Sequence, residues 1–237
     1  MTRLRPCVVS VAVAIVSGMA KRSSARTPRI EPLALNHLTE GEGAALVAGA
    51  DLDGLRFERL VAPASLAGTT LLECEVTELT ADRLDMRGAR VLESRLARWA
   101  APTIAAHGSS WRDAELIESR IGALDVTDAD VRRLVVEGSK LGWVNLRGST
   151  VHDVVFRNCT FDELDFGGAQ LARVAFEDCV TEKLTLTQAR ADGLDLRGLE
   201  FHAIEGLEGL RGATISGEQT QLLAETFAAH FGATVEG

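Results

Sequence analysis

The sequence predicts an all-β solenoid built from square coils, because two periods are nested in it. From Leu66 to Phe201 every fifth residue is apolar, with Thr181 as the exception. A helix repeats its inward face every ~3.6 residues and a plain strand repeats it every second residue, so neither keeps a register of five over this length. The repeating unit is therefore a short extended segment followed by a corner.

A second period, of twenty residues, groups these segments into coils. A glycine recurs at one place in the longer unit, at Gly68, Gly88, Gly108, Gly148 and Gly168. Glycine adopts positive φ at little steric cost, so its return once per unit marks a corner of the coil. Four segments of five residues then complete one square turn.

The first coil departs from this register. Leu52, Phe57 and Ala62 are its inward candidates, and they are out of phase with the later inward positions by one residue. Pro63 stands at the break. We predict one irregular corner at that point.

Short motifs beside the corners resemble a known consensus. Four triplets contain Asp or Asn between two apolar residues: Leu84-Asp85-Met86, Val144-Asn145-Leu146, Leu164-Asp165-Phe166 and Leu194-Asp195-Leu196. They resemble the pentapeptide-repeat family, whose consensus is a small residue, Asp or Asn, Leu and two variable residues. The resemblance covers about residues 50 to 205. It implies a right-handed quadrilateral β-helix of about eight coils, roughly 35 to 38 Å long at ~4.8 Å per coil.

The chain divides into four parts around this solenoid. We expect an N-terminal extension over residues 1–36, an N-terminal cap over 37–50, the β-helix over 51–205 and a C-terminal cap over 206–237. An open end of a solenoid exposes unpaired backbone, so both ends need a cover.

The C-terminal cap is predicted to contain an α-helix over about residues 217–231. Ser216 and Gln219 form a capping-box pattern before it. One apolar face of the helix is then made by Leu223, Phe227 and Phe231. Two interpretations are open: the helix covers the last coil, or, as the resemblance implies, it joins two rods end to end in a homodimer.

The N-terminal extension has two interpretations. Arg3 and Arg5 precede an apolar run from Cys7 to Val16, which is typical of a secretory signal and too short to span a membrane. Alternatively translation starts at Met19, which gives the polar, basic first residues of a cytoplasmic protein. We favour the cytoplasmic interpretation, with secretion as the alternative, and expect residues 21–36 to form a flexible arm.

The sequence predicts no enzyme, metal site or cofactor. Its five histidines fall on different sides and coils, so no catalytic group can be assembled from them. Three aspartates line up at twenty-residue spacing, where a carboxylate usually accepts from local backbone N–H groups: Asp85, Asp125 and Asp165. Three cysteines take small inward places as buried thiols: Cys74, Cys159 and Cys179. We expect no direct nucleic-acid binding and no membrane binding.

Charge gives the main functional indication. The chain holds 25 basic and 34 acidic residues, and six of the basic and one of the acidic residues precede residue 37. The rest therefore holds 19 basic and 33 acidic residues, a net charge of −14. One corner would carry an acidic ladder, interrupted by Arg133 and ended by Arg173, made by Glu73, Glu93, Asp113 and Asp153. The resemblance implies a duplex-shaped decoy that binds DNA gyrase or topoisomerase IV.

The amount of charge limits this hypothesis. Duplex DNA carries one charge per ~1.7 Å, so a length of about 38 Å presents roughly 22 negative charges. Residues 51–205 hold 27 acidic and 18 basic residues, a net charge of −9. The alternative is a protein-interaction scaffold that binds through an exposed apolar strip, for which the candidates are Ile117, Val135, Val155 and Trp143.

Overall fold

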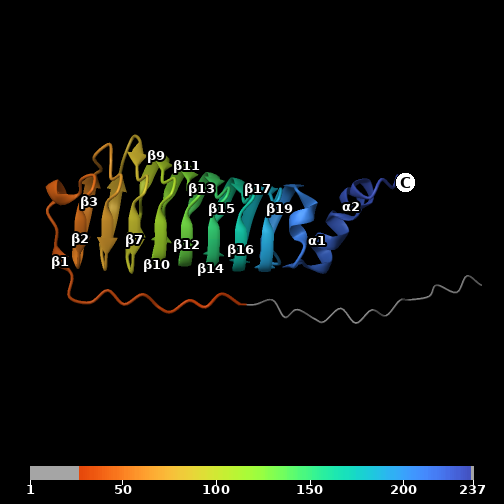
Figure 1. The fold of residues 1–237 in the computed structure, drawn as a ribbon, viewed down its shortest axis with the longest axis horizontal. Helices are drawn as coiled ribbons and strands as arrows, with labels where there is room; N and C mark the ends of the chain where they lie inside the picture. Colours follow the sequence, from red (N-terminus) through yellow and green to blue (C-terminus); the bar gives the residue numbers. More distant parts are fainter. Residues whose placement is uncertain (1–26, 236–237) are drawn as a thin grey trace, which may run out of the picture.

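The protein is a rod whose strands run across its long axis. The structure, a computed structural model, describes residues 27–235 and shows a parallel β-solenoid of about nine turns (Figure 1). The predicted fold class is confirmed. The signal-like segment and the alternative start at Met19 lie outside the described residues.

In residues 27–235, twenty strands form the solenoid, and all of their pairings are parallel. The first six are β1 (Thr39–Glu40), β2 (Asp51–Asp53), β3 (Leu55–Val61), β4 (Thr70–Leu72), β5 (Glu75–Thr80) and β6 (Leu84–Asp85). The middle ones are β7 (Arg90–Leu92), β8 (Arg95–Ala97), β9 (Ala100–Ala105), β10 (Ser110–Ile117), β11 (Arg120–Asp125), β12 (Asp130–Glu137) and β13 (Lys140–Asn145). The last are β14 (Thr150–Arg157), β15 (Thr160–Asp165), β16 (Gln170–Glu177), β17 (Cys179–Thr185), β18 (Arg190–Asp195), β19 (Leu199–Glu205) and β20 (Ala213–Thr214).

The register between neighbouring coils is twenty residues through most of the rod. Trp111 lies opposite Val131, and Val131 lies opposite Val151. The predicted break at Pro63 is confirmed, because Val61 pairs nineteen residues ahead with Thr80, whereas Ser65 pairs twenty ahead with Asp85. The first coil is therefore one residue shorter at that corner.

The solenoid is longer than the eight coils predicted. β1 pairs with β3 ahead of the recognised repeats, and β20 pairs with β18 after them. Neither strand has the period of five around it, so the sequence gives no signal for these outer pairings. The coil before β20 includes the short 3-10 helix η2 (Leu207–Leu210), and there Leu194 pairs nineteen residues ahead with Ala213.

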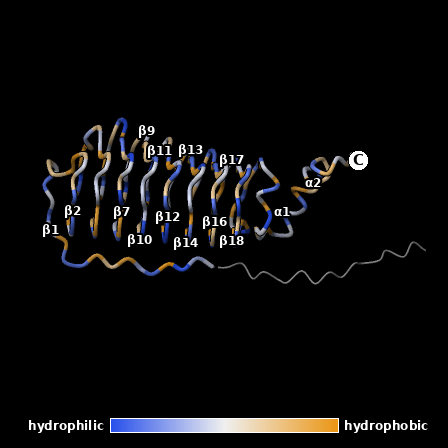
Figure 2. Tube along the Cα trace, in the orientation of Figure 1, coloured by the Kyte–Doolittle hydropathy of each residue, from blue (hydrophilic) through white to orange (hydrophobic). Residues whose placement is uncertain are grey.

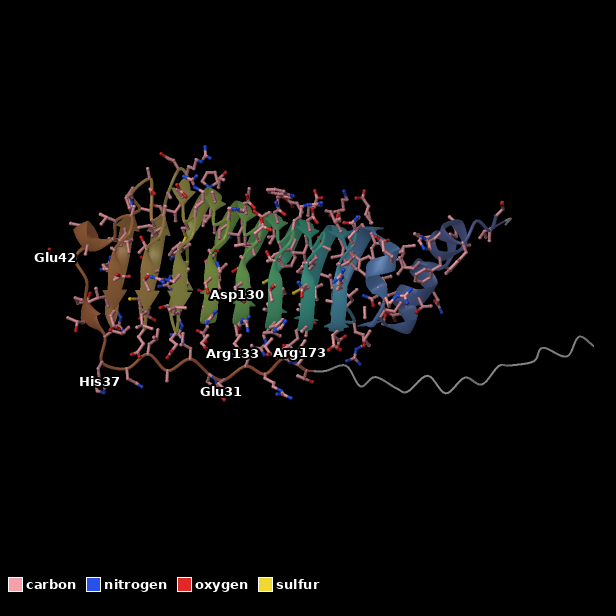
Figure 3. The ribbon with its side chains drawn as sticks, in the orientation of Figure 1. Glu31, His37, Glu42, Asp130, Arg133 and Arg173 are labelled. Carbon is pink, nitrogen blue, oxygen red and sulfur yellow. The ribbon has the colours of Figure 1, made fainter. Side chains whose placement is uncertain are left out.

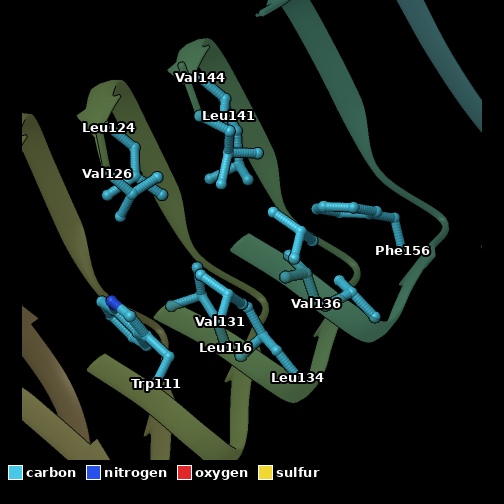
Figure 4. Close-up of a pocket in the computed structure, with 13 residues that line it drawn as sticks. Trp111, Leu116, Leu124, Val126, Val131, Leu134, Val136, Leu141, Val144 and Phe156 are labelled. Atoms are coloured by element: carbon cyan, nitrogen blue, oxygen red, sulfur yellow. The ribbon is translucent and has the colours of Figure 1, made fainter. Parts of the chain in front are cut away.

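The core is a column of apolar side chains inside the coils. Hydrophobic and hydrophilic residues alternate along each turn (Figure 2). Val131 occupies the inward place one coil after Trp111, and Val136 occupies the inward place one coil before Phe156. Because these valines are smaller than the two aromatic residues, they leave an apolar cavity of about 30 Å³ (Figure 4). A cavity of this size without polar lining stays dry, so it is a packing gap and no ligand site.

Cysteines and aspartates take the places that the sequence predicts. Cys74, Cys159 and Cys179 are buried free thiols. The neighbouring Cys179 thiol and burial raise the pKa of Cys159, which keeps it protonated. Local turn bonds are confirmed at three aspartates, which accept from the backbone N–H two residues ahead: Asp85 at 3.0 Å, Asp125 at 3.2 Å and Asp165 at 2.7 Å.

Both ends of the solenoid are covered. At the N-terminal end, the 3-10 helix η1 (Gly43–Ala45) leads to Leu46, which is buried in the core. At the C-terminal end follow α1 (Gly217–Leu222) and α2 (Ala224–His230), and the predicted capping box of Ser216 and Gln219 is confirmed. The Gln219 amide also donates to the backbone oxygens of Leu196 and Leu199, at 2.7 and 2.8 Å.

The C-terminal segment is two short helices, which differs from the single predicted helix. They meet at Leu223, which is buried against the last coil, while Phe227 is half-buried and Phe231 is 83% exposed. Along the predicted apolar face, the side chains thus become more exposed with distance from the last coil. Within the described residues, no helix has both the length and the apolar character needed to span a membrane.

Candidate functional site

One corner of the solenoid carries a stack of charged residues. We call it the corner column, and it consists of Glu73, Glu93, Asp113, Arg133, Asp153 and Arg173. All six adopt left-handed backbone conformations, with φ between 48° and 55°. This conformation is uncommon for residues other than glycine, so the corner is held by the stacked strands on either side of it.

The corner column is only partly acidic. Arg133 makes a two-pronged ion pair with Asp113, in which Nη2 and Oδ2 are 2.6 Å apart. Arg173 binds Asp153 in the same way, with both hydrogen bonds at 2.6 Å. Glu73 and Glu93 form no ion pair with another described residue. The structure thus stacks the four predicted acids, but two of them are neutralised by the residue one coil ahead.

The pKa shifts follow from these pairs. Burial acts to raise the pKa of Asp153, but hydrogen bonds from the Arg173 side chain and the Arg29 backbone outweigh it and hold the pKa below its usual value. The bond to Asp113 raises the pKa of Arg133, and the charges of Asp113, Asp153 and Glu31 add to this. The shifts therefore favour the charged forms of Asp153, Arg133 and Arg173 at neutral pH.

A second column alternates in charge on the neighbouring side. Arg56 binds Glu75 at 2.8 Å, Arg95 binds Glu75 at 3.3 Å, and Arg95 binds Glu115 at 2.6 Å. Further along, the same column turns apolar. We call that part the valine strip, and it consists of Val135, Val155 and Ala175.

The N-terminal arm lies along the corner column. We use this name for residues 27–37, which run in extended form beside the coils and nearly parallel to the rod axis (Figures 1 and 3). The Arg29 N–H donates to Asp153 Oδ1 at 2.8 Å. Sequence reasoning predicts a flexible segment here. The contact between the arm and the coils could not be predicted, because the arm has no periodic sequence pattern that indicates a place on the solenoid.

The arm also explains a difference at the predicted apolar strip. The sequence predicts that Val135 and Val155 are exposed. This is wrong, because Val135 is only 7% and Val155 only 3% exposed. Pro28 and Ile30 of the arm line one hollow together with Val155. The arm therefore covers part of the surface that the sequence offers to a partner.

The other two candidates of that strip lie on two different sides of the solenoid. Ile117 is half-buried and pairs with Ala97 and Glu137 on the side of the valine strip. Trp143 pairs with Ala123 and Glu163 on a different side, where it is 38% exposed. The four predicted residues do not form one surface.

Chemistry-bearing groups do not converge in the part of the chain that the structure describes. No group of three or more His, Cys, Asp or Glu residues there is placed to hold a metal ion. His107 contacts Thr127 at 2.9 Å, and His202 lies 3.6 Å from Glu182, both on open surface. What the side of the rod offers is a row of fixed charges beside apolar residues, which is suited to binding a polypeptide.

Comparison with known families agrees with the repeat geometry. The model of pentapeptide repeats, described as nine copies, matches residues 137–180. Coils on both sides of this stretch share its strand length and its left-handed corners. The chain thus contains pentapeptide repeats and resembles the proteins of that family, as its sequence predicts.

Solved structures of other pentapeptide-repeat proteins resemble the chain at low identity. Two structures of QnrB1, a plasmid-mediated fluoroquinolone resistance protein, are 14% and 15% identical, each over 84% of this chain and over 96% and 95% of their own, with TM-scores of 0.31 and 0.33. HetL from the cyanobacterium Nostoc, a pentapeptide repeat protein involved in heterocyst differentiation regulation, is 15% identical over 69% of this chain and 86% of its own, with a TM-score of 0.25. No curated protein matches the chain.

The pair of Asp153 and Arg173 makes a testable contribution to the stability of the pentapeptide-repeat rod. We expect Asp153→Asn to lower the free energy of unfolding at pH 7 by about 1.5–3 kcal/mol, the range for a hydrogen-bonded charged group. Asparagine tolerates the left-handed corner, so the backbone is kept. Because the folded pKa is depressed, the difference from wild type is present above the unfolded value of about 3.9 and disappears as pH falls through the folded pKa.

Denaturant unfolding between pH 2 and 7 measures this difference. The matched control is Asp178→Asn, which replaces an exposed aspartate at another left-handed corner that has no ion pair with a described residue. Equal losses in the two variants, or a loss at Asp153 that is independent of pH, would contradict the assignment.

Proposed function

We propose that this pentapeptide-repeat protein acts by binding another protein along the side of its solenoid, and not by catalysis. The docked arm supports this most directly, because it is an extended polypeptide seated on a side of the rod with a hydrogen bond to Asp153. The side surface thus has the shape and the groups that a polypeptide ligand needs. A solenoid suits such a role, because its coils present one continuous surface along the rod.

DNA gyrase or topoisomerase IV is the partner that we propose first. The net charge of −14 after residue 36 favours attraction to a basic cleft built for DNA. The charge pairs limit how the mimicry would work, because Asp113 and Asp153 are already neutralised. Glu73 and Glu93 would then carry most of the attraction that the corner column offers.

A scaffold with a different protein partner is the second candidate. The alternating column from Arg56 to Glu115 favours this candidate. Alternating charges are complementary to a partner whose own charges alternate in the same order, and they are not complementary to a uniformly basic cleft. Binding of this kind also depends on the valine strip and changes less with salt.

Inhibition of gyrase supercoiling by the purified chain tests the first candidate. We expect inhibition that weakens at the higher of two salt concentrations, and a loss of most of it in Glu73→Gln/Glu93→Gln. The matched control replaces two exposed acids on other parts of the rod, Glu118→Gln and Asp178→Asn, and should inhibit like wild type. No inhibition at saturating protein would exclude gyrase and leave the scaffold.

We further propose that the protein forms a homodimer through its C-terminal helices. Phe231 is 83% and Leu222 is 63% exposed at the end of the rod, and Phe227 is half-buried beside them. Exposed aromatic and aliphatic side chains at one end of a molecule favour a self-complementary contact.

The molecular mass in solution tests the dimer. We expect light scattering to give twice the chain mass for wild type and the monomer mass for Phe231→Glu. Because Phe231 lies outside the core, the variant should keep the thermal unfolding temperature of the solenoid. A wild-type monomer at concentrations of about 100 μM would refute this proposal; interfaces of stable dimers are normally populated well below that.

A further inference from the structure

The arm touches the side of the solenoid only in part. Between residues 31–37 and the corner column lies an open hollow of about 870 Å³, lined on the solenoid side by Glu73, Glu93, Asp113 and Arg133. The arm thus bridges this part of the surface and does not fill it. The groove is therefore incompletely filled by the arm, and a segment with longer side chains could make more contacts in its place.

The two charged residues of the arm match the charges beneath them. The positive charge of Arg29 interacts with the carboxylate of Asp153, and the Arg29 backbone N–H donates a hydrogen bond to the same carboxylate. Glu31 lies close enough to Arg133 for their charges to interact (Figure 3). The arm therefore follows the order of charges along the corner column, acid opposite base at two successive coils.

The length of the arm suits the length of the column. Asp153 and Glu73 are four coils apart, which is about 19 Å at ~4.8 Å per coil. The eight residue-to-residue steps from Arg29 to His37 span up to about 26–29 Å when the chain is extended. Pro28 and Pro32 favour such an extended backbone. One segment of this kind can contact every coil of the corner column from Asp153 to Glu73.

The apolar contact is made by Ile30. It is half-buried, and it lines one hollow with Val155 and Ala175 and the other with Arg133. An isoleucine directly after the residue bound to Asp153 is thus accommodated beside the valine strip. This gives the groove an apolar subsite next to a charged one.

The far end of the groove is left without a charge partner. Glu73 and Glu93 are exposed and have no ion pair with a described residue; of the arm residues that line the hollow with them, Leu33, Ala34 and Asn36 are uncharged side chains and His37 is an imidazole. A segment with lysine or arginine at those places would complement both glutamates. The arm is therefore a suboptimal occupant of this surface.

The arm is also held by few interactions. In the described part of the chain, the bond from Arg29 N–H to Asp153 is the hydrogen bond that joins residues 27–37 to the coils. The arm pairs with no strand. A segment with so few buried contacts opens locally at low cost in free energy.

We propose that the groove between the corner column and the valine strip binds an extended segment of a partner protein, with an apolar side chain at Val155 and basic side chains at Glu73 and Glu93, and that this segment displaces the arm. The inference rests on the proposed function, since it names the chemistry of the partner at the same side of the rod. The arm acts as an internal competitor, so the apparent affinity of the groove for a partner is the intrinsic affinity multiplied by the fraction of molecules whose arm is undocked.

Fluorescence anisotropy with labelled peptides and the full chain tests the proposal. The first probe has the sequence of residues 27–37. We expect it to bind the chain variant Ile30→Asp, whose own arm is weakened, about fivefold more tightly than wild type. A second probe, with lysine at the places of Ala34 and Asn36, should bind at least fivefold more tightly still and should weaken with salt.

Variants of the groove supply the controls. Ala175→Glu, placed in the Ile30→Asp chain, should abolish binding of both probes, and circular dichroism should show it folded, since Ala175 is on the outer side of the coil. Glu73→Gln/Glu93→Gln should remove only the gain from the lysines. A third probe, with glutamate at the same two places, should bind more weakly than the first.

Several results would overturn the proposal. They are equal binding of the first probe to wild type and Ile30→Asp, binding that survives in a folded Ala175→Glu variant, or no binding of any probe at about 1 mM. These outcomes are separate from the gyrase assay, because a chain that does not inhibit gyrase can still bind the probes. Conversely, failure of the probes would refute the groove, while salt-sensitive inhibition of gyrase that weakens in Glu73→Gln/Glu93→Gln would still support the proposed function.

Discussion

Stacking of each coil on the next is the constraint on which the rest of the structure depends. The strands inside the rod find their hydrogen-bond partners about twenty residues away, in the coils before and after them. Because unpaired buried backbone is costly, one inserted or deleted residue must be confined to a corner, as it is near Pro63. The same stacking forces residues twenty apart into contact on the outside, so the surface is a set of columns.

The columns explain why net charge is a poor guide to this protein. An acid and a base at i and i+20 are brought together whatever the total charge, as in the pairs of Asp113 with Arg133 and Asp153 with Arg173. From Asp113 to Arg173 the corner column therefore alternates in charge, and another chain can match this order of charges coil by coil. The arm does so at Arg133 and Asp153, which supports the proposed binding of a polypeptide.

The sequence predicts the solenoid well because one periodic signal, the apolar residue at every fifth place, is imposed by the fold itself. The capping box and the turn aspartates are equally local, and so they could be predicted. The charge pairs could have been found by aligning the chain at twenty residues. The docked arm could not, since its contact with Asp153 spans 124 residues and is set by tertiary placement alone. For the same reason the sequence predicts an exposed valine strip, which the structure shows to be largely buried.

The central claim is that the side of the rod holds an extended chain segment, and the free protein can show this directly. A nitroxide label at Arg157→Cys, in a chain with Cys7→Ser, would stand in the hollow that Thr27, Pro28 and Ile30 line. The account predicts strong paramagnetic broadening of the amide signals of Arg29 and Ile30, and none for the amides of α2. Sharp, unbroadened signals from the arm would contradict it.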